Sequence, residues 1–233
     1  LSINNINVVW NDDRDGNNEI YFKRSTDGGY NWDPVVRITN NASSSTNPSI
    51  SGLADNIYIS WQDNRDGNNE IYYNFSSTMG ASWGTDTRLT NDAASSKLPC
   101  ISAEPMSPQS FVHVAWQDDR DGNNEIYYKR STSNGSSWEA VQRLTNSAGN
   151  SLAPVIISSN HFVHLVWEDD RSGGIYGVYY NRSTNDGTSW VSDLKLNTST
   201  ATARNPSVYR NSSEIHVVWW DNRDNDYEIY YKK

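Results

Sequence analysis

The segment that decides the fold is Trp10-Asn-Asp-Asp-Arg-Asp-Gly-Asn-Asn-Glu-Ile-Tyr-Phe22. Close relatives of this segment recur along the chain at spacings of 51, 55, 51 and 52 residues, beginning at Trp61, Trp116, Trp167 and Trp219. A second Trp follows each of the first four copies, at Trp32, Trp83, Trp138 and Trp190. Nine of the ten Trp residues therefore follow one period, which identifies the chain as a repeat protein.

Each repeat is expected to contain four short strands separated by turns. In the second copy these strands are 48–51, 57–61, 70–75 and 87–90. Apolar and polar residues alternate in the second and third strands, as half-buried strands require. The Asp-Gly-Asn-Asn sequence between them suits a hairpin turn, because Gly and Asn accept positive φ. Four antiparallel strands repeated about five times predict an all-β fold, a single β-propeller domain over residues 1–233.

The first and last repeats are incomplete. In the first copy the first strand is expected to be missing or very short, and the last copy ends at Lys233, directly after its third strand. We therefore expect one of two arrangements. Either the ring closes with two three-stranded blades, or neighbouring domains or other copies in a homo-oligomer complete it.

Composition excludes several other classes of protein. The aromatic content of 12% disfavours disorder, and the abundance of Asn, Ser, Thr, Trp and Tyr disfavours a helical fold. A single Cys, Cys100, excludes an intrachain disulfide framework. The net charge of −9 argues against nucleic acid as a partner, and no apolar stretch is long enough for a membrane span.

The second Trp series carries a resemblance to a known family. Ser25-Thr-Asp27-Gly-Gly29-Tyr-Asn-Trp32 matches the Asp-box, Ser-x-Asp-x-Gly-x-x-Trp, of sialidases and other BNR-repeat propellers. The repeated Trp-x-Asp-x-Arg segment also resembles repeats of TolB-like propellers. The resemblance implies a propeller whose Asp-boxes lie on the hairpin between the third and fourth strands of each blade. The resemblance indicates the fold of the protein more than its activity.

The Asp-box residues are interpreted as structural. The later copies keep Gly and Trp but have Thr78, Ser133 and Asn185 in place of the Asp, which preserves a turn and would damage a catalytic acid. The residues assigned to these turns are Ser25, Asp27, Gly29, Trp32, Gly80, Trp83, Gly135, Trp138, Gly187 and Trp190.

The loop between the second and third strands, here called the arginine loop, is the candidate ligand-binding element. In an up-and-down meander these loops lie on the face opposite the Asp-box turns. Together they carry a charge of −13, against −9 for the whole chain, so the acidity is concentrated on one face. The candidate residues are Asp12, Arg14, Glu19, Asp63, Arg65, Glu70, Asp118, Arg120, Glu125, Asp169, Arg171, Asp221, Arg223 and Glu228.

Three interpretations of these loops remain open. Asp and Arg could pair within and between blades and fix their register. The spacing of Asp13, Asp15 and Glu19 resembles oxygen-ligand loops for Ca²⁺, the one cofactor considered, although the central Arg opposes a cation. Carboxylates, Arg and aromatic rings could instead hold a glycan.

Catalysis receives little support from the sequence. A sialidase-like hydrolase would need an arginine cluster, a nucleophile and an acid at positions that break the repeat. The exceptions to the repeat are Glu104, Arg204, Arg210 and the fourth loop over 172–177, and these do not supply that set. No catalytic residue and no metal ligand is therefore assigned.

The sequence thus predicts a secreted or cell-surface propeller that binds a glycan or a surface protein. A structural, adhesion or assembly subunit is the first alternative, and a sialidase-like glycoside hydrolase is the second. Six Asn-x-Ser/Thr sequons are compatible with an extracellular location.

Overall fold

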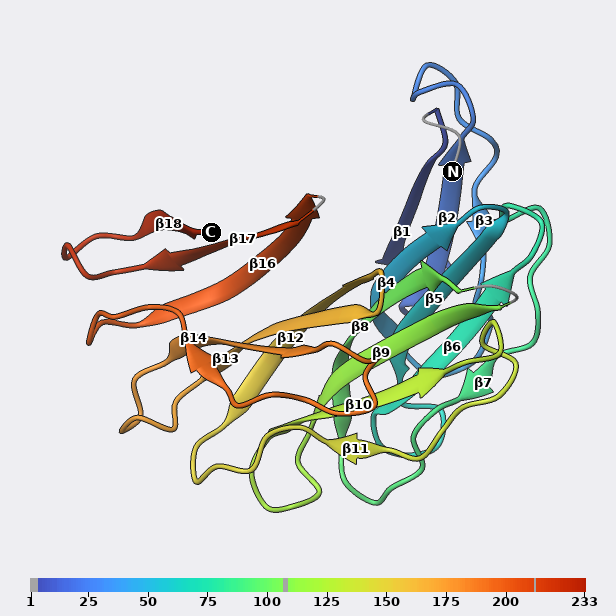
Figure 1. Cartoon of the computed structure of the whole chain (residues 1–233). Helices are drawn as coiled ribbons and strands as arrows, with labels where there is room; N and C mark the ends of the chain where they lie inside the picture. Colours follow the sequence, from blue (N-terminus) through green and yellow to red (C-terminus); the bar gives the residue numbers. More distant parts are fainter. Residues whose placement is uncertain (1–3, 107–108, 212) are drawn as a thin grey trace.

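The computed structural model describes residues 4–106, 109–211 and 213–233, in which every regular element is a β-strand (Figure 1). The strands form five antiparallel sheets.

Sheet 1 contains β1 (Ile6–Asp12), β2 (Glu19–Ser25) and β3 (Val36–Arg37). Sheet 2 contains β4 (Ser45–Leu53), β5 (Asn56–Asp63), β6 (Glu70–Ser76) and β7 (Thr87–Arg88). Sheet 3 contains β8 (Ser96–Pro105), β9 (Ser110–Asp118), β10 (Glu125–Ser131) and β11 (Gln142–Arg143). Sheet 4 contains β12 (Ser151–Ser159), β13 (Phe162–Asp169), β14 (Gly177–Ser183) and β15 (Leu194–Lys195). Sheet 5 contains β16 (Ala203–Asn211), β17 (Glu214–Asp221) and β18 (Glu228–Lys232).

Each sheet is a meander in which consecutive strands pair. In sheet 2 the arginine loop is closed by the pairing of Asp63 with Glu70, and Gly67 turns the chain with a φ of 102°. The expectation of an all-β fold is confirmed, and sheets 2, 3 and 4 have the expected four strands.

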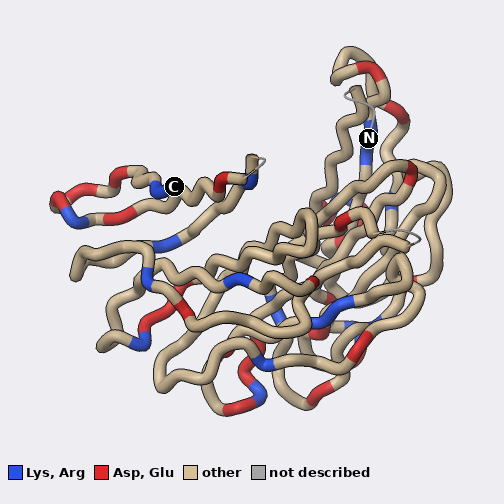
Figure 2. Tube along the Cα trace, viewed as in Figure 1, with Lys and Arg blue, Asp and Glu red and all other residues tan. Residues whose placement is uncertain are grey.

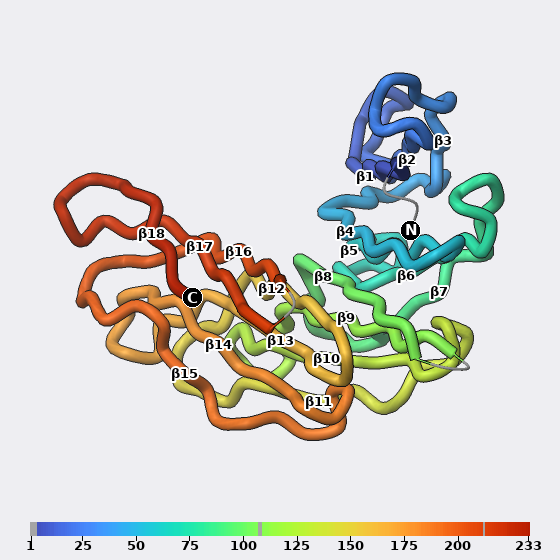
Figure 3. The backbone as a smooth tube through the Cα atoms, turned by 45° about the horizontal axis from the view of Figure 1, so that its top comes forward, coloured from blue at the N-terminus to red at the C-terminus, as the bar shows by residue number. Residues whose placement is uncertain are grey.

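The sheets follow one another in an arc, with the first strand of each sheet on the inside (Figures 1 and 3). The inner strands contact each other directly: the amides of Ile101 and Ala103 in β8 donate to the hydroxyls of Ser49 and Ser51 in β4. Sheets 1 and 5 lie apart in both views. The ring is therefore open over the described residues, and it is not closed by its two three-stranded sheets.

The hydrophobic core lies between the sheets. One buried apolar cluster fills each of the four spaces between consecutive sheets. The Trp that begins each arginine loop is buried in its cluster in sheets 2 to 5, as Trp61, Trp116, Trp167 and Trp219. A sheet therefore depends on its neighbours to cover its apolar side chains.

The Asp-box turns hold their own backbone. The Ser25 hydroxyl accepts a hydrogen bond from the Gly29 amide at 2.8 Å, and Asp27 Oδ1 accepts one from the Asn31 amide at 2.8 Å. In later turns Thr78, Ser133 and Asn185 accept the equivalent amide hydrogen bond at 2.9 Å. The side chain at this position serves as a backbone acceptor, a role that hydroxyl, amide and carboxylate oxygens can all perform.

Each later Asp-box turn also packs onto the preceding sheet. Trp83, Trp138 and Trp190 meet an aromatic ring of that sheet edge to face, at centroid distances of 5.1, 5.0 and 5.1 Å. The Gly of the turn allows this approach, since a Cβ at Gly135 would lie 1.9 Å from Tyr73 Oη. Trp32, in the first turn, is exposed.

This difference predicts unequal costs for the same substitution. Trp138→Ala should lower the free energy of unfolding by about 3 kcal/mol, because it empties the space between two sheets. Trp32→Ala is the matched control and should cost about 0.5 kcal/mol or less, as at other exposed positions. Urea denaturation of both variants measures this, and equal costs would contradict the assignment of the later Trp residues to the core.

Candidate functional site

The arginine loops are organised around a buried carboxylate. In sheet 2, Asp63 has no exposed surface and accepts hydrogen bonds from Trp61 Nε1 at 3.1 Å and from Ser45 Oγ at 2.7 Å. It also accepts from the amide and the guanidinium of Arg65, at 2.9 and 2.6 Å. The guanidinium of Arg65 lies over the Tyr72 ring, 4.3 Å from its centroid. The loop is thus fixed by one carboxylate and one guanidinium.

The same ion pair occurs in all five arginine loops. It joins Asp12 to Arg14, Asp63 to Arg65, Asp118 to Arg120, Asp169 to Arg171 and Asp221 to Arg223. Figure 2 shows acidic and basic segments side by side in loops at the edge of the molecule. The Asp and Arg residues of the candidate ring therefore face each other within each loop.

These ion pairs determine the ionisation of the buried carboxylates. Burial alone would raise the pKa of Asp118, but hydrogen bonds from Arg120, Ser96 and Trp116 hold it below the ordinary value. Burial also raises the pKa values of Asp63 and Asp169, but their hydrogen-bond donors outweigh this effect and the net pKa is lowered. These groups are carboxylates at neutral pH.

The Glu residues of the candidate ring join each loop to the rest of its sheet. Glu70 Oε1 accepts from Arg88 at 2.7 Å and from the amide of Asp92 at 3.0 Å, in the connection to the next sheet. Glu19 and Glu125 contact Arg37 and Arg143 in the same way. Glu228 is exposed, because sheet 5 has no fourth strand beside it.

Two of the three carboxylates considered for Ca²⁺ are paired with donors of the protein. Asp15 accepts from Tyr21 and pairs with Arg37 at 3.1 Å, and Glu19 pairs with the same Arg at 2.9 Å. Among the residues that the structure describes, no group of three His, Cys, Asp or Glu side chains could hold a metal ion. No helix of the described chain is long and apolar enough to cross a membrane.

A different cluster lies where sheets 4 and 5 depart from the repeat. The aromatic-arginine cluster, as we call it, consists of Glu168, Tyr176, Arg204, Asn205, Trp220 and Tyr227. Tyr176 and Tyr227 occupy the position of Asn18, Asn69 and Asn124 in the earlier loops. Trp220 occupies the position of Asn11, Gln62, Gln117 and Glu168.

Direct contacts connect the cluster. Arg204 Nε donates to Glu168 Oε2 at 2.7 Å, and the Arg204 guanidinium lies 4.2 Å from the centroid of the Tyr176 ring. The amide of Asn205 is assigned the orientation in which it donates to Glu168 at 3.2 Å and accepts from Trp220 Nε1 at 2.7 Å. Trp220 meets Tyr227 edge to face at 5.0 Å. Polar and aromatic groups thus occur together on the arginine-loop face.

Asn205 also connects the cluster to a cavity among the inner strands. In sheets 2 to 5 the inner strand contains a bulge, at which Asn47, Leu98, Ala153 or Asn205 has a φ near 50° and precedes a Pro. These residues and their prolines line one open cavity of about 320 Å³. Gln62, Gln117 and Glu168 accept hydrogen bonds from the amides of Leu98, Ala153 and Asn205, so sheets 2, 3 and 4 each support the bulge of the next sheet.

The exceptions noted in the sequence do not converge. Arg204 and Arg210 are six residues apart on β16, which separates them by roughly 20 Å along the strand. Glu104 is buried beside His113 at 3.1 Å. Arg210 donates to the carbonyl of Ser159 at the far end of the sheet. The described residues therefore do not bring these arginines into one anion-binding cluster.

No protein-family model and no curated protein matches the chain. Solved structures do match it in fold. The GH93 α-L-arabinofuranosidase of Fusarium graminearum is 17% identical, with a TM-score of 0.68, over 98% of this chain and 78% of that chain. A Hadza microbial sialidase is 14% identical, with a TM-score of 0.62, over 92% of this chain and 50% of that chain. The GH43 endo-arabinanase from Bacillus licheniformis is 13% identical, with a TM-score of 0.53, over 100% of this chain and 90% of that chain.

These neighbours are β-propellers. At such low identity the likeness shows the fold alone, and this chain spans half the length of the sialidase. The all-β architecture expected from the sequence is thus shared with propellers of known structure.

Sequence reasoning missed most of the aromatic-arginine cluster. Trp220 is the one Trp outside the two periodic series, and within the cluster only Arg204 and the fourth loop stand out in the sequence as exceptions to the repeat. The available signal was positional: aromatic residues replace amides at equivalent places in the last two repeats only.

The buried carboxylates predict how stability depends on pH. The pKa values of these carboxylates are lower in the folded than in the unfolded protein, where they are about 3.9. Their contribution to the free energy of unfolding is therefore complete above about pH 3.9 and is lost as the pH falls through the folded pKa values. Asp118→Asn should lower stability at pH 7 and make the decline between pH 4 and pH 2 less steep. Urea denaturation across this range measures the slope, and an unchanged slope would contradict a depressed pKa for Asp118.

Proposed function

We propose that this protein is a non-catalytic carbohydrate-binding propeller at an extracellular location or on a cell surface. Its glycan would bind on the arginine-loop face, at the aromatic-arginine cluster and the adjoining inner cavity. The observation that carries the proposal is the clustering of Tyr176, Trp220 and Tyr227 around one Arg, one carboxylate and one amide. Aromatic rings provide apolar faces for a sugar ring, while the polar groups bond its hydroxyls.

The charges of the site favour a neutral sugar. Glu168 neutralises Arg204 at 2.7 Å, so the guanidinium is not free to hold the carboxylate of a sialic acid. The surrounding loops are acidic and would repel an anionic glycan. Neutral oligosaccharides, including the arabino-oligosaccharides suggested by the names of the arabinan-active neighbours, are therefore the first ligands to test.

The candidate ring is proposed to serve this site indirectly. Its Asp and Arg residues hold the arginine loops in place, and the residues that differ between loops contact the ligand. A carboxylate that already accepts from Arg204 and the Asn205 amide, as Glu168 does, is better suited to orient a bound sugar than to donate a proton.

Tyr227 provides the direct test of binding. It is 68% exposed, so Tyr227→Ala should remove a sugar-stacking face without a large cost in stability. We expect at least tenfold weaker binding of the best neutral ligand from a glycan array, measured by calorimetry. Tyr30→Ala is the matched control, since Tyr30 is 90% exposed in an Asp-box turn on the opposite face, and it should bind normally. An equal loss in both variants would contradict the placement of the site.

Catalysis is tested separately with chromogenic arabinofuranosides and sialosides. We expect no turnover above the uncatalysed rate. Turnover that disappears in Glu168→Gln would show that the protein is a glycoside hydrolase and would contradict the non-catalytic part of the proposal.

A further inference from the structure

An asparagine side chain fastens the arginine loop of sheets 1, 2 and 3 to the connection that follows it in the chain. In sheet 2, Asn68 Nδ2 donates to the carbonyl of Asp92 at 3.0 Å and to the carbonyl of Ala94. Asn17 and Asn123 make the same two bonds in sheets 1 and 3. We call this contact the Asn latch. It bonds each loop to two carbonyls that lie 24 and 26 residues further along the chain.

Two carboxylates hold the same loops to the rest of their sheets. In sheet 2, Asp66 accepts from the Tyr72 hydroxyl and pairs with Arg88 at 3.2 Å. Glu70 pairs with the same Arg at 2.7 Å. The equivalent carboxylates of sheets 1 and 3 make the same contacts, and they are Asp15, Glu19, Asp121 and Glu125. In these three sheets, each loop is therefore fixed by three side chains.

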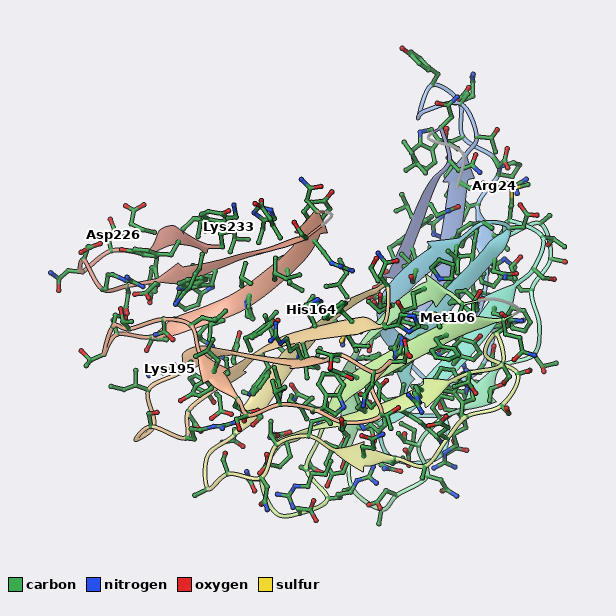
Figure 4. All side chains as sticks on the ribbon, viewed as in Figure 1. Arg24, Met106, His164, Lys195, Asp226 and Lys233 are labelled. Atoms are coloured by element: carbon green, nitrogen blue, oxygen red, sulfur yellow. The ribbon has the colours of Figure 1, made fainter. Side chains whose placement is uncertain are left out.

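The arginine loop of sheet 4, residues 170–176, and the first residue of β14 lack these three side chains. The equivalent positions are occupied by Ser172, Ile175 and Gly177. The partner Arg is replaced by Lys195, which lies on β15 at the edge of sheet 4 (Figure 4). Within the part of the chain that the structure describes, the one side-chain hydrogen bond of residues 172–175 joins Ser172 Oγ to Tyr179 Oη at 3.0 Å. The tip of this loop, residues 172–175, is therefore not latched.

Both ends of the loop remain fixed in the sheet. Arg171 retains its ion pair with the buried carboxylate of the loop, and the Tyr176 carbonyl accepts a hydrogen bond from the Ala203 amide at 2.8 Å. Between these points, Gly173 and Gly174 have φ values of 98° and 82°, and a Cβ on either would meet no atom within 4 Å. An open cavity of about 300 Å³ is lined by this tip and by the connection from sheet 3 to sheet 4. Because glycine changes its backbone conformation at little steric cost, the tip can move while the two ends stay in place.

The tip carries an apolar side chain beside the proposed glycan site. Ile175 is 42% exposed, at a position where the latched loops have Asn. It directly precedes Tyr176, whose ring centroid lies 4.2 Å from the Arg204 guanidinium. Consecutive Cα atoms are about 3.8 Å apart, so Ile175 lies within reach of a sugar held on the Tyr176 ring. Burial of this exposed side chain against an apolar face of the sugar is favourable.

We propose that the tip, residues 172–175, closes over a neutral oligosaccharide bound in the aromatic-arginine cluster and places Ile175 against the sugar. This closure rests on the function proposed above, because it requires a sugar in the cluster. The absence of the Asn latch permits the movement. A ligand shifts such a segment only through a contact that exists in the closed form, and Ile175 supplies this contact.

Hydrogen exchange of two equivalent amides tests the freedom of the tip without any ligand. The Gly174 amide donates to the Asp170 carbonyl at 3.0 Å, and the Gly67 amide donates to the Asn64 carbonyl at 3.1 Å. The two bonds are alike, but only the loop of Gly67 is latched. We therefore expect the Gly174 amide to exchange about tenfold faster, measured by NMR. Equal exchange rates would overturn the proposal, whether or not a glycan binds.

Arabinopentaose is the probe for closing, and the neutral glycan that binds best on an array replaces it if arabinopentaose does not bind. At saturation we expect the probe to slow exchange of the Gly174 amide about fivefold and to leave the Gly67 amide unchanged. Binding that leaves the Gly174 exchange rate unchanged would overturn the closure while the proposed function stands. Absence of binding by every neutral glycan would overturn the proposed function and the closure together.

Two substitutions of one residue separate the sugar contact from the latch. Ile175→Ser removes the apolar side chain, and we expect about fivefold weaker binding of the probe with Gly174 exchange still fast. Val191→Ser is the matched control, because Val191 is 48% exposed after the fourth Asp-box turn, and it should bind normally. Normal binding by Ile175→Ser would overturn the proposed contact.

Ile175→Asn removes the same contact and also supplies a donor for the latch. The carbonyls that would accept from it are those of Ser199 and Ala201, which lie 24 and 26 residues further along the chain as in the latched loops. We expect slower Gly174 exchange in this variant than in Ile175→Ser, and weaker binding of the probe, because the tip is held open. Equal exchange in the two variants would contradict the Asn latch as the constraint that this loop lacks.

Discussion

The structure depends on the packing of each sheet against the next. The sheets are small meanders whose apolar side chains point toward a neighbour, and the buried clusters lie between sheets. An isolated sheet of three or four short strands cannot bury such side chains. The exposure of Ile6 and Val8 on sheet 1, and of Ile229 and Tyr231 on sheet 5, follows from the same requirement, since each lies on a face without a neighbour.

Polar residues make this packing specific. An apolar face alone would allow adjacent sheets to slide, but Glu70 bonds both to Arg88 in its own sheet and to the connection that leads to the next sheet. Gln62 and Gln117 each reach an amide in the following sheet, at Leu98 and Ala153. These contacts use directional hydrogen bonds in buried places, where leaving a polar group unpaired is costly. They fix the register of the arc.

The sequence was sufficient to predict the repeated part of the fold. The alternation around Trp61 and the turn at Gly67 predict a hairpin from local rules, and β5 and β6 form it. The sequence could not determine whether the ring closes, because closure depends on the accumulated angle between sheets rather than on any local pattern. It also could not predict the inner cavity, since Leu98 and Ala153 have a positive φ that such residues do not favour.

The candidate site was harder to predict for a related reason. The Asp and Arg residues of the loops are present in every copy, and the sequence therefore suggests a ring of ligand-binding residues. In the structure these residues bond each other within each loop and hold that loop in place. The residues of the proposed site instead lie where the repeat is broken, as Tyr176, Arg204 and Trp220 do.

The fourth repeat shows how such a break is accommodated. Gly177 replaces the buried Glu of the other loops, and the Arg that would pair with that Glu is replaced by Lys195. Asn197 replaces the usual Thr and still accepts the amide hydrogen bond at the start of the third strand, from Val178 at 2.9 Å. The carboxylate is removed while a cation remains, and Lys195 Nζ lies 6.0 Å from the centroid of the Tyr179 ring. No buried carboxylate is therefore left without a partner at this position. The loop is then free of the constraint that Glu imposes, and it places Tyr176 against Arg204. A new surface is thereby made where the framework loses one buried carboxylate.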